Sequence, residues 1–92
     1  MANLRNEARG RECQVRIPFY CNRDSNTVVL AHLRLSGISG MGIKAPDIFG
    51  AWCCSGCHAY VDTHHNDETQ LTFAEGIFRT QAVLIKEGKL KW

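Results

Sequence analysis

The stretch Cys54-Ser55-Gly56-Cys57-His58 decides the fold, because it sets two cysteines one tight turn apart with a histidine directly after them. A CxxC turn presents two thiolates to one metal ion, and zinc prefers four such ligands in a tetrahedron. A second pair of cysteines lies upstream, at Cys13 and Cys21. The sequence therefore predicts a structural Zn²⁺ held by Cys13, Cys21, Cys54 and Cys57.

A disulfide framework is the alternative use of these cysteines. The chain has five cysteines, an odd number, and it begins MANLRNEARG without an apolar signal segment. We therefore expect a reducing, cytoplasmic setting, where such cysteine spacings bind metal more often than they oxidise. Cys53 is left without a ligand role and is expected to be a small buried side chain.

Length and charge set limits on the kind of protein. The 92 residues predict one domain, 1–92. Its hydrophobic core is small, so a bound metal would add to the stability of the fold. No apolar run approaches the 18 or so residues of a membrane helix, so we expect no membrane partner. The net charge is only +2, but arginines crowd the first quarter of the chain. They are either a phosphate-binding face or ordinary solvated surface.

The secondary structure is read from local patterns. We expect a short helix over 3–10, an extended segment over 13–17 and a strand over 27–35. A glycine-rich loop over 36–42 leads to a second extended piece over 48–52. A helix is expected to begin at the CxxC turn and to end in the polar run 63–68.

The last helix carries the clearest pattern. Thr72 and Glu75 match a capping box, and Gly88 is placed as a C-terminal stop. Apolar residues follow the cap at mostly helical spacing, and we interpret all of them as core: Phe73, Ala74, Ile77, Phe78, Ala82 and Ile85.

With Cys13 and Cys21, Ala31-His32 and the run 54–58, the order strand, glycine loop, strand and helix resembles a ββα-metal nuclease domain of the HNH type. Several segments spread over nearly the whole chain carry a closer likeness: 8–18, Leu30-Ala31-His32, Pro46-Asp47, 54–58 with Asp62, Arg79-Thr80-Gln81 and Lys86-Glu87-Gly88. On these segments the chain resembles the Rap/YbcO family of small prophage-encoded, HNH-like nucleases. The resemblance implies an α+β fold: a small zinc-stabilised ββα-metal domain with an additional C-terminal helix, acting in the cytoplasm of a bacterial host.

The resemblance also implies catalytic residues. His32 takes the place of the general base, a role that suits an imidazole because this group can accept a proton at neutral pH. The alternative is a histidine that is only hydrogen-bonded on a strand. Asp47 is the nearest candidate for the middle residue of the motif, where it orients His32 or contacts metal. After Pro46, it is equally compatible with plain turn chemistry.

A catalytic divalent cation, Mg²⁺, Mn²⁺ or Zn²⁺, is the second implied cofactor. His58 and Asp62 lie four residues apart, so on a helix both project from one face and can chelate one ion. Two other interpretations stay open: His58 as a zinc ligand in place of a cysteine, and Asp62 as a solvated helix residue. Ala31 stands where many HNH domains carry a further metal ligand, which departs from the family pattern.

Together these features predict a metal-dependent endonuclease that hydrolyses DNA phosphodiester bonds in phage recombination or replication. Flanking phosphates are expected to contact basic side chains without sequence readout. The candidates are Arg9, Arg11, Arg16, Arg34 and Lys44. Cutting both strands of a duplex favours a homodimer. The alternative is a catalytically inactive zinc-binding module that serves as a DNA or protein adaptor, which the alanine at position 31 supports.

Overall fold

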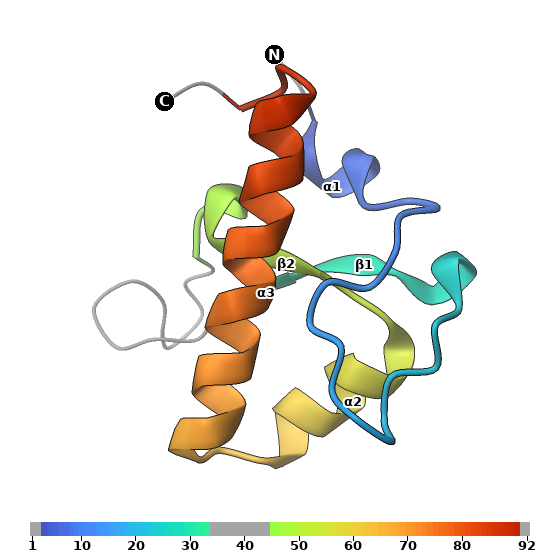
Figure 1. Cartoon of the computed structure of the whole chain (residues 1–92), viewed down its shortest axis with the longest axis vertical. Coiled ribbons are helices and arrows are strands. Elements are labelled where there is room, and N and C mark those ends of the chain that lie inside the picture. Colours follow the sequence, from blue (N-terminus) through green and yellow to red (C-terminus); the bar gives the residue numbers. More distant parts are fainter. Residues whose placement is uncertain (1–2, 34–44, 91–92) are drawn as a thin grey trace.

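The computed structural model describes residues 3–33 and 45–90. Within them the fold combines a two-stranded sheet with three helices, which confirms the expected α+β class (Figure 1). The elements in chain order are α1 (Leu4–Glu7), a 3₁₀ turn (Ser25–Thr27), β1 (Val29–His32), a second 3₁₀ turn (Asp47–Phe49), β2 (Gly50–Cys53), α2 (Ser55–Thr63) and α3 (Asp67–Lys86).

The strands β1 and β2 form an antiparallel hairpin in which Val29 faces Cys53 and His32 faces Gly50. Both strands begin later than the sequence predicts, and positions 34 and 35 of the first predicted strand lie outside the described residues. Asp24 caps a 3₁₀ turn at 25–27 by accepting from the Asn26 amide, so the strand begins only after that turn. A second 3₁₀ turn occupies 47–49 and delays β2 in the same way. The glycine-rich loop, with Arg34 and Lys44, lies outside the described residues.

The segment 13–17 was expected to be extended and is instead irregular. Arg16 has a φ of 56°, in the left-handed region, which breaks an extended path. The helix predicted over 3–10 is confirmed only in its first half, since α1 ends at Glu7 and a turn follows.

The long helix α3 packs against β2 and runs the length of the molecule in front of the hairpin (Figure 1). The buried Thr80 hydroxyl accepts from the Trp52 amide at 3.0 Å and donates to the Gly76 carbonyl at 2.8 Å. Arg79 donates through Nε to the Gln14 carbonyl at 2.8 Å. Through these contacts α3 holds both the loop that contains Cys13 and the strand that leads to Cys54.

The predicted start of the last helix was wrong, and its predicted end is confirmed. Asn66 caps α3 by accepting from the Thr69 amide at 2.8 Å, six residues before Thr72, the expected cap. Acidic residues in the first turn then favour this earlier start. At the other end, Gly88 adopts a φ of 74°. Its amide and that of Lys89 bond to the Ile85 and Leu84 carbonyls, a Schellman motif.

The core forms where α3 and β2 meet, around Trp52 and Cys53. Phe73, Ile77 and Leu84 supply the helix side of it. The prediction that Phe78, Ala82 and Ile85 also belong to the core was wrong, because these residues lie on the opposite side of α3 and are exposed. In the part of the chain that the structure describes, no helix has the length and apolar character needed to cross a membrane.

Candidate metal centre and histidine site

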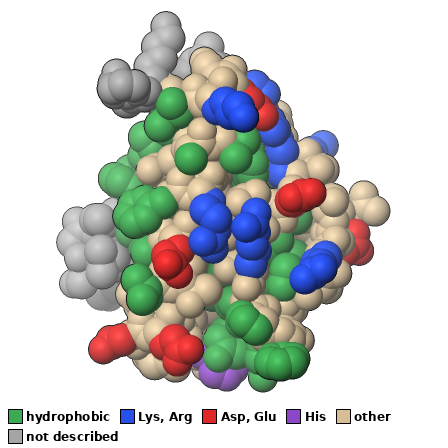
Figure 2. Space-filling model, viewed as in Figure 1, with side chains coloured by type: hydrophobic (Ala, Val, Ile, Leu, Met, Phe, Trp, Pro, Cys, Tyr) green, Lys and Arg blue, Asp and Glu red, His purple; other side chains and the backbone are tan. Residues whose placement is uncertain are grey.

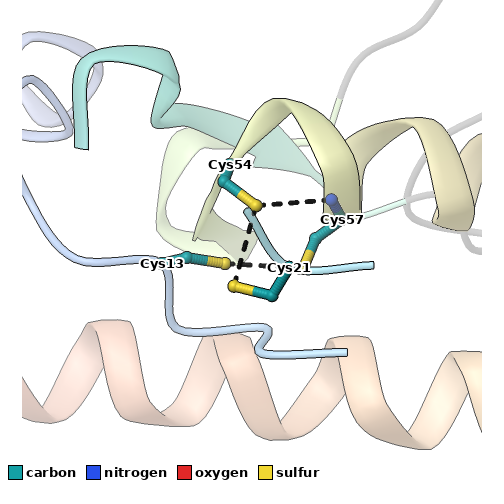
Figure 3. A group of neighbouring side chains, drawn as sticks. All are labelled: Cys13, Cys21, Cys54 and Cys57. Atoms are coloured by element: carbon teal, nitrogen blue, oxygen red, sulfur yellow. Dashed lines mark hydrogen bonds between the residues drawn. The ribbon is translucent and has the colours of Figure 1, made fainter. Parts of the chain in front are cut away.

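Four cysteine sulfurs meet at one point between the loop 13–21 and the start of α2 (Figure 3). All four Sγ atoms lie within 4.8 Å of one another. Cys13 and Cys57 are 3.7 Å apart, and Cys21 and Cys54 are 3.8 Å apart. Sulfurs placed ~2.3 Å from a tetrahedral zinc are separated by roughly 3.8 Å.

These separations decide between metal and disulfide. A disulfide requires a sulfur–sulfur distance near ~2.05 Å, and all five cysteines are free. The cluster therefore has the ligand type, number and spacing to hold a metal such as zinc. The predicted set of four cysteines is brought together in full.

The CxxC half of the cluster is shaped by the start of α2. Cys54 is the N-cap residue, and its sulfur accepts from the Cys57 amide at 3.4 Å. The Cys57 sulfur in turn accepts from the Ile17 amide at 3.3 Å. Gly56 lies directly against the other half, since a Cβ there would be 2.0 Å from the Tyr20 carbonyl oxygen. Only glycine lets the two cysteine segments approach this closely.

The Cys13–Cys21 half is a strained loop. Arg16, Phe19 and, just beyond the loop, Arg23 all have positive φ angles, between 54° and 69°. Such a conformation costs a non-glycine residue about 1–2 kcal/mol. A bound metal that holds both ends of the loop offsets this cost, because its binding energy is realised only in the folded chain.

The protonation of the cysteines also favours a cation. A hydrogen bond from Cys53 and backbone amides lower the pKa of Cys13 to about 3, although burial opposes the shift. Burial raises the pKa of Cys21 and of Cys57 above the ordinary thiol value. Four adjacent thiolates repel one another, so a divalent cation is what allows all of them to ionise. Cys53 is fully buried beside the cluster, as expected.

A second constellation forms at the far end of the hairpin. His32 ends β1, and Asp47 begins the 3₁₀ turn that leads into β2. The His32 Nε2 and Asp47 Oδ1 atoms are 2.7 Å apart. A carboxylate in this position accepts from Nε2–H, which leaves Nδ1 with the free lone pair. The structure thus joins the predicted base to the residue expected to orient it.

Arg5 is a third member of this constellation that sequence reasoning missed. Its Nε lies 3.3 Å from the same Asp47 oxygen. Together, His32 first and Arg5 second, these partners lower the pKa of Asp47, against the effect of burial. No local signal identifies Arg5, because 42 positions separate it from Asp47.

His58 and Asp62 pair on the surface of α2, as their four-residue spacing predicts. The His58 Nε2 and Asp62 Oδ2 atoms are 3.9 Å apart, and both side chains are about two-fifths exposed. Within residues 3–33 and 45–90, the four cysteines are the only group of three or more possible ligands, and it does not include His58. Ala31 is buried and offers no ligand atom.

The predicted phosphate-binding residues differ in their surroundings. Arg11 already binds both oxygens of Glu87 at 2.6 Å and lies over the Trp52 ring at 4.7 Å. Arg9 and Arg16 are exposed, although Arg16 also donates to the Cys13 carbonyl. Arg34 and Lys44 fall outside the described residues, and the roles of all five stay predictions.

Comparison with known proteins gives one consistent result. The family model described as "Putative nuclease YbcO" matches residues 2–89. Two curated relatives with that name, one from Escherichia coli (strain K12) and one from Enterobacteria phage 82, are each 50% identical over 95 aligned positions, covering 99% of both chains.

A solved structure agrees with the family model. It is described as a putative bacteriophage protein from Escherichia coli, and it has 42% sequence identity and a TM-score of 0.76. The match covers 94% of this chain and all of that one. The chain therefore belongs to the YbcO family, and the family description and both curated relatives carry the name "Putative nuclease".

Proposed function

We propose that this protein is a metal-dependent endonuclease of the HNH-like type that hydrolyses DNA phosphodiester bonds. The observation that carries the proposal is the 2.7 Å contact between His32 Nε2 and Asp47 Oδ1. A fixed imidazole with one free nitrogen is the group that general-base catalysis needs. The nuclease name shared by the family members supplies the reaction class.

In this mechanism His32 accepts a proton from water through Nδ1. Asp47 holds the ring in the required tautomer and stabilises the imidazolium that forms, while Arg5 holds Asp47 in place. The activated water attacks phosphorus in line, the P–O3′ bond breaks, and the departing 3′ oxygen takes a proton from solvent. A divalent cation supplies charge stabilisation at the phosphate when bound, and His58 and Asp62 are the residues that would hold it.

The four-cysteine centre has a structural role in this proposal. It fixes the start of α2, and with it the positions of His58 and Asp62 on that helix. Arg9 and Arg16 are exposed and can contact flanking phosphates, which positions DNA without reading its sequence. Action on DNA in the cytoplasm of a bacterial host, during phage recombination or replication, is part of the same proposal.

A second candidate is a zinc-stabilised adaptor without catalytic activity. The observation that favours it is the incomplete ligand set: Ala31 is buried, and no third histidine, cysteine or acidic ligand among the described residues joins His58 and Asp62. This adaptor would bind DNA or protein through the same fold.

Cleavage assays separate the two candidates. Zinc-loaded protein is incubated with supercoiled plasmid and with branched DNA in Mg²⁺, Mn²⁺ or Zn²⁺. A parallel sample is exposed to EDTA, for a time short enough to leave the structural zinc in place. His32→Ala is compared with His65→Ala, which changes an exposed histidine outside both constellations. Metal-dependent nicking lost only in His32→Ala supports the nuclease. Folded wild type that cuts nothing, or equal cutting by both variants, favours the adaptor.

Metal placement is tested with two further variants. His58→Ala and Asp62→Ala are expected to raise the Mg²⁺ or Mn²⁺ concentration needed for half-maximal cutting while leaving the zinc content at one equivalent. Unchanged metal dependence in both variants would contradict the proposed cation site without affecting the role of His32.

A further inference from the structure

The helix α3 has a second apolar stripe on the side away from the core. Leu71, Phe78 and Ile85 are 62%, 66% and 39% exposed. The buried positions, Phe73, Ile77, Thr80 and Leu84 among them, lie on the opposite side of the helix. A helix on the surface of a monomer is normally polar on its outer side. Figure 2 shows hydrophobic side chains reaching the surface alongside α3.

The spacing of this stripe fits another helix. Leu71, Phe78 and Ile85 are separated by seven residues each, the repeat with which helices pack along one seam. Phe78 stands at the middle, with Leu71 seven residues before it and Ile85 seven after. An antiparallel copy of the same helix, related by a two-fold axis at Phe78, would therefore place Leu71 against Ile85 at both ends.

The charges on α3 favour that arrangement. The first turn carries Asp67 and Glu68, and the last turn carries Lys86. At 100° per residue, Glu68 and Lys86 lie on the same side of the apolar stripe. The two-fold axis would bring the Lys86 of one copy beside the Glu68 of the other. Within the described part of the chain, neither side chain takes part in an ion pair.

We propose that the stripe Leu71–Phe78–Ile85 binds a second copy of this chain through an antiparallel α3–α3 contact. The contact leaves the core side of α3 and the four-cysteine centre untouched. At ~1.5 Å per residue α3 is about 30 Å long, so the contact buries less than the roughly 800 Å² per partner of a standard interface. The dimer is accordingly expected to dissociate in the micromolar range. It would bring two His32 centres to one DNA molecule.

Sedimentation equilibrium of the zinc-loaded protein across the micromolar range tests the contact. Wild type is expected to fit a monomer–dimer equilibrium, and Phe78→Glu to remain monomeric. Val29→Glu is the matched control, because Val29 is an apolar residue on β1, outside the stripe, and is 47% exposed. Circular dichroism and zinc content confirm that each variant is folded. Monomeric wild type throughout, or equal loss of dimer in both variants, overturns the proposal.

A charge exchange tests the antiparallel geometry. Glu68→Lys and Lys86→Glu are each expected to weaken the dimer about twofold to fivefold, and the double variant to restore it. Absence of rescue overturns the proposed arrangement. The readout is mass in solution rather than cleavage, so an inactive protein that still dimerises contradicts only the proposed function.

Discussion

The Sγ atoms of Cys13 and Cys57 lie 3.7 Å apart, although 44 positions separate the two residues in the chain. Cys21 and Cys54 make the matching contact at 3.8 Å across 33 positions. The two halves of the cluster are far apart in the sequence, so the chain must fold before the four sulfurs meet. Metal bound there consequently contributes its binding energy to folding.

Replacing one ligand should release the metal and unfold the protein. We expect Cys54→Ser to lose stoichiometric zinc and its cooperative thermal transition. Cys53→Ala is the control, because Cys53 is buried next to the cluster but is not one of the four ligands. The Cys53→Ala variant should keep one equivalent of zinc and should still unfold cooperatively, at a lower melting temperature than wild type. Zinc content and melting by circular dichroism measure both, and a stable, cooperatively folded Cys54→Ser variant would contradict the structural role of the metal.

The His32–Asp47 pair predicts graded effects on cleavage. Loss of the base in His32→Ala should lower kcat by at least about 100-fold. Asp47→Asn keeps the shape but removes the charge that fixes the ring, and should lower kcat by about 10- to 100-fold with little change in KM. Single-turnover cleavage of a labelled duplex measures both. Full activity in Asp47→Asn would contradict a role for Asp47 in orienting His32 and would leave it only a role in the turn.

Gly56 is expected to tolerate no side chain. The Cβ of Gly56→Ala would lie 2.0 Å from the backbone oxygen of Tyr20, so the two cysteine segments would have to separate. Overpacking of this kind costs about 1–3 kcal/mol, and it should weaken zinc binding as well.

Gly88→Ala is the contrasting variant, since a Cβ there meets nothing within 4 Å and is opposed only by the φ of 74°. It should cost about 1 kcal/mol and leave zinc affinity unchanged. Thermal melts and competition with a chromogenic chelator compare the two. Equal zinc affinity in both variants would show that the close approach at Gly56 does not position the cluster.

The Arg11–Glu87 ion pair predicts how the thermal stability of the protein depends on pH. Arg11 first, and Lys89 more weakly, lower the pKa of Glu87 from 4.5 to about 2. A carboxyl group with a lowered pKa stabilises the fold above its unfolded pKa, and this contribution is lost only as pH falls through the folded value. Arg11→Gln should therefore melt about 2–6 °C below wild type, by the same margin at pH 6 and pH 8.

Salt provides the control for this pair. The difference between Arg11→Gln and wild type should shrink in 1 M NaCl, because both groups are partly exposed and the charges are screened. A difference that changes between pH 6 and pH 8 would point to another titrating group.

Local patterns predicted the elements that local chemistry controls. The CxxC turn that opens α2, the polar run that ends it and the glycine that stops α3 are all confirmed, because each depends on residues within a few positions. The start of α3 was placed wrongly since two competing caps, Asn66 and Thr72, lie close together. The Asn66 cap, followed by Asp67 and Glu68 in the first turn, is the one that the helix uses.

The local sequence of α3 does not distinguish its buried face from its exposed apolar face. Phe73 and Phe78 are the same residue type on the same helix, yet one is 6% and the other 66% exposed. An apolar residue on a helix indicates that its side chain packs against another surface. The helical spacing does not show whether that surface belongs to this chain or to another. The packing of α3 on β2 settles that question, because it places Phe73 in the core and leaves Phe78 outside.

The sequence by itself determined the ligand type and number of the candidate metal centre, the α+β class and the membership of the family. Thiolates in a CxxC turn and an additional pair specify their chemistry wherever the chain folds. Tertiary structure alone decided that Asp47 meets His32, that Arg5 joins them and that α3 keeps an exposed apolar stripe. These contacts depend on segments distant in sequence, whose approach is fixed by packing rather than by local spacing.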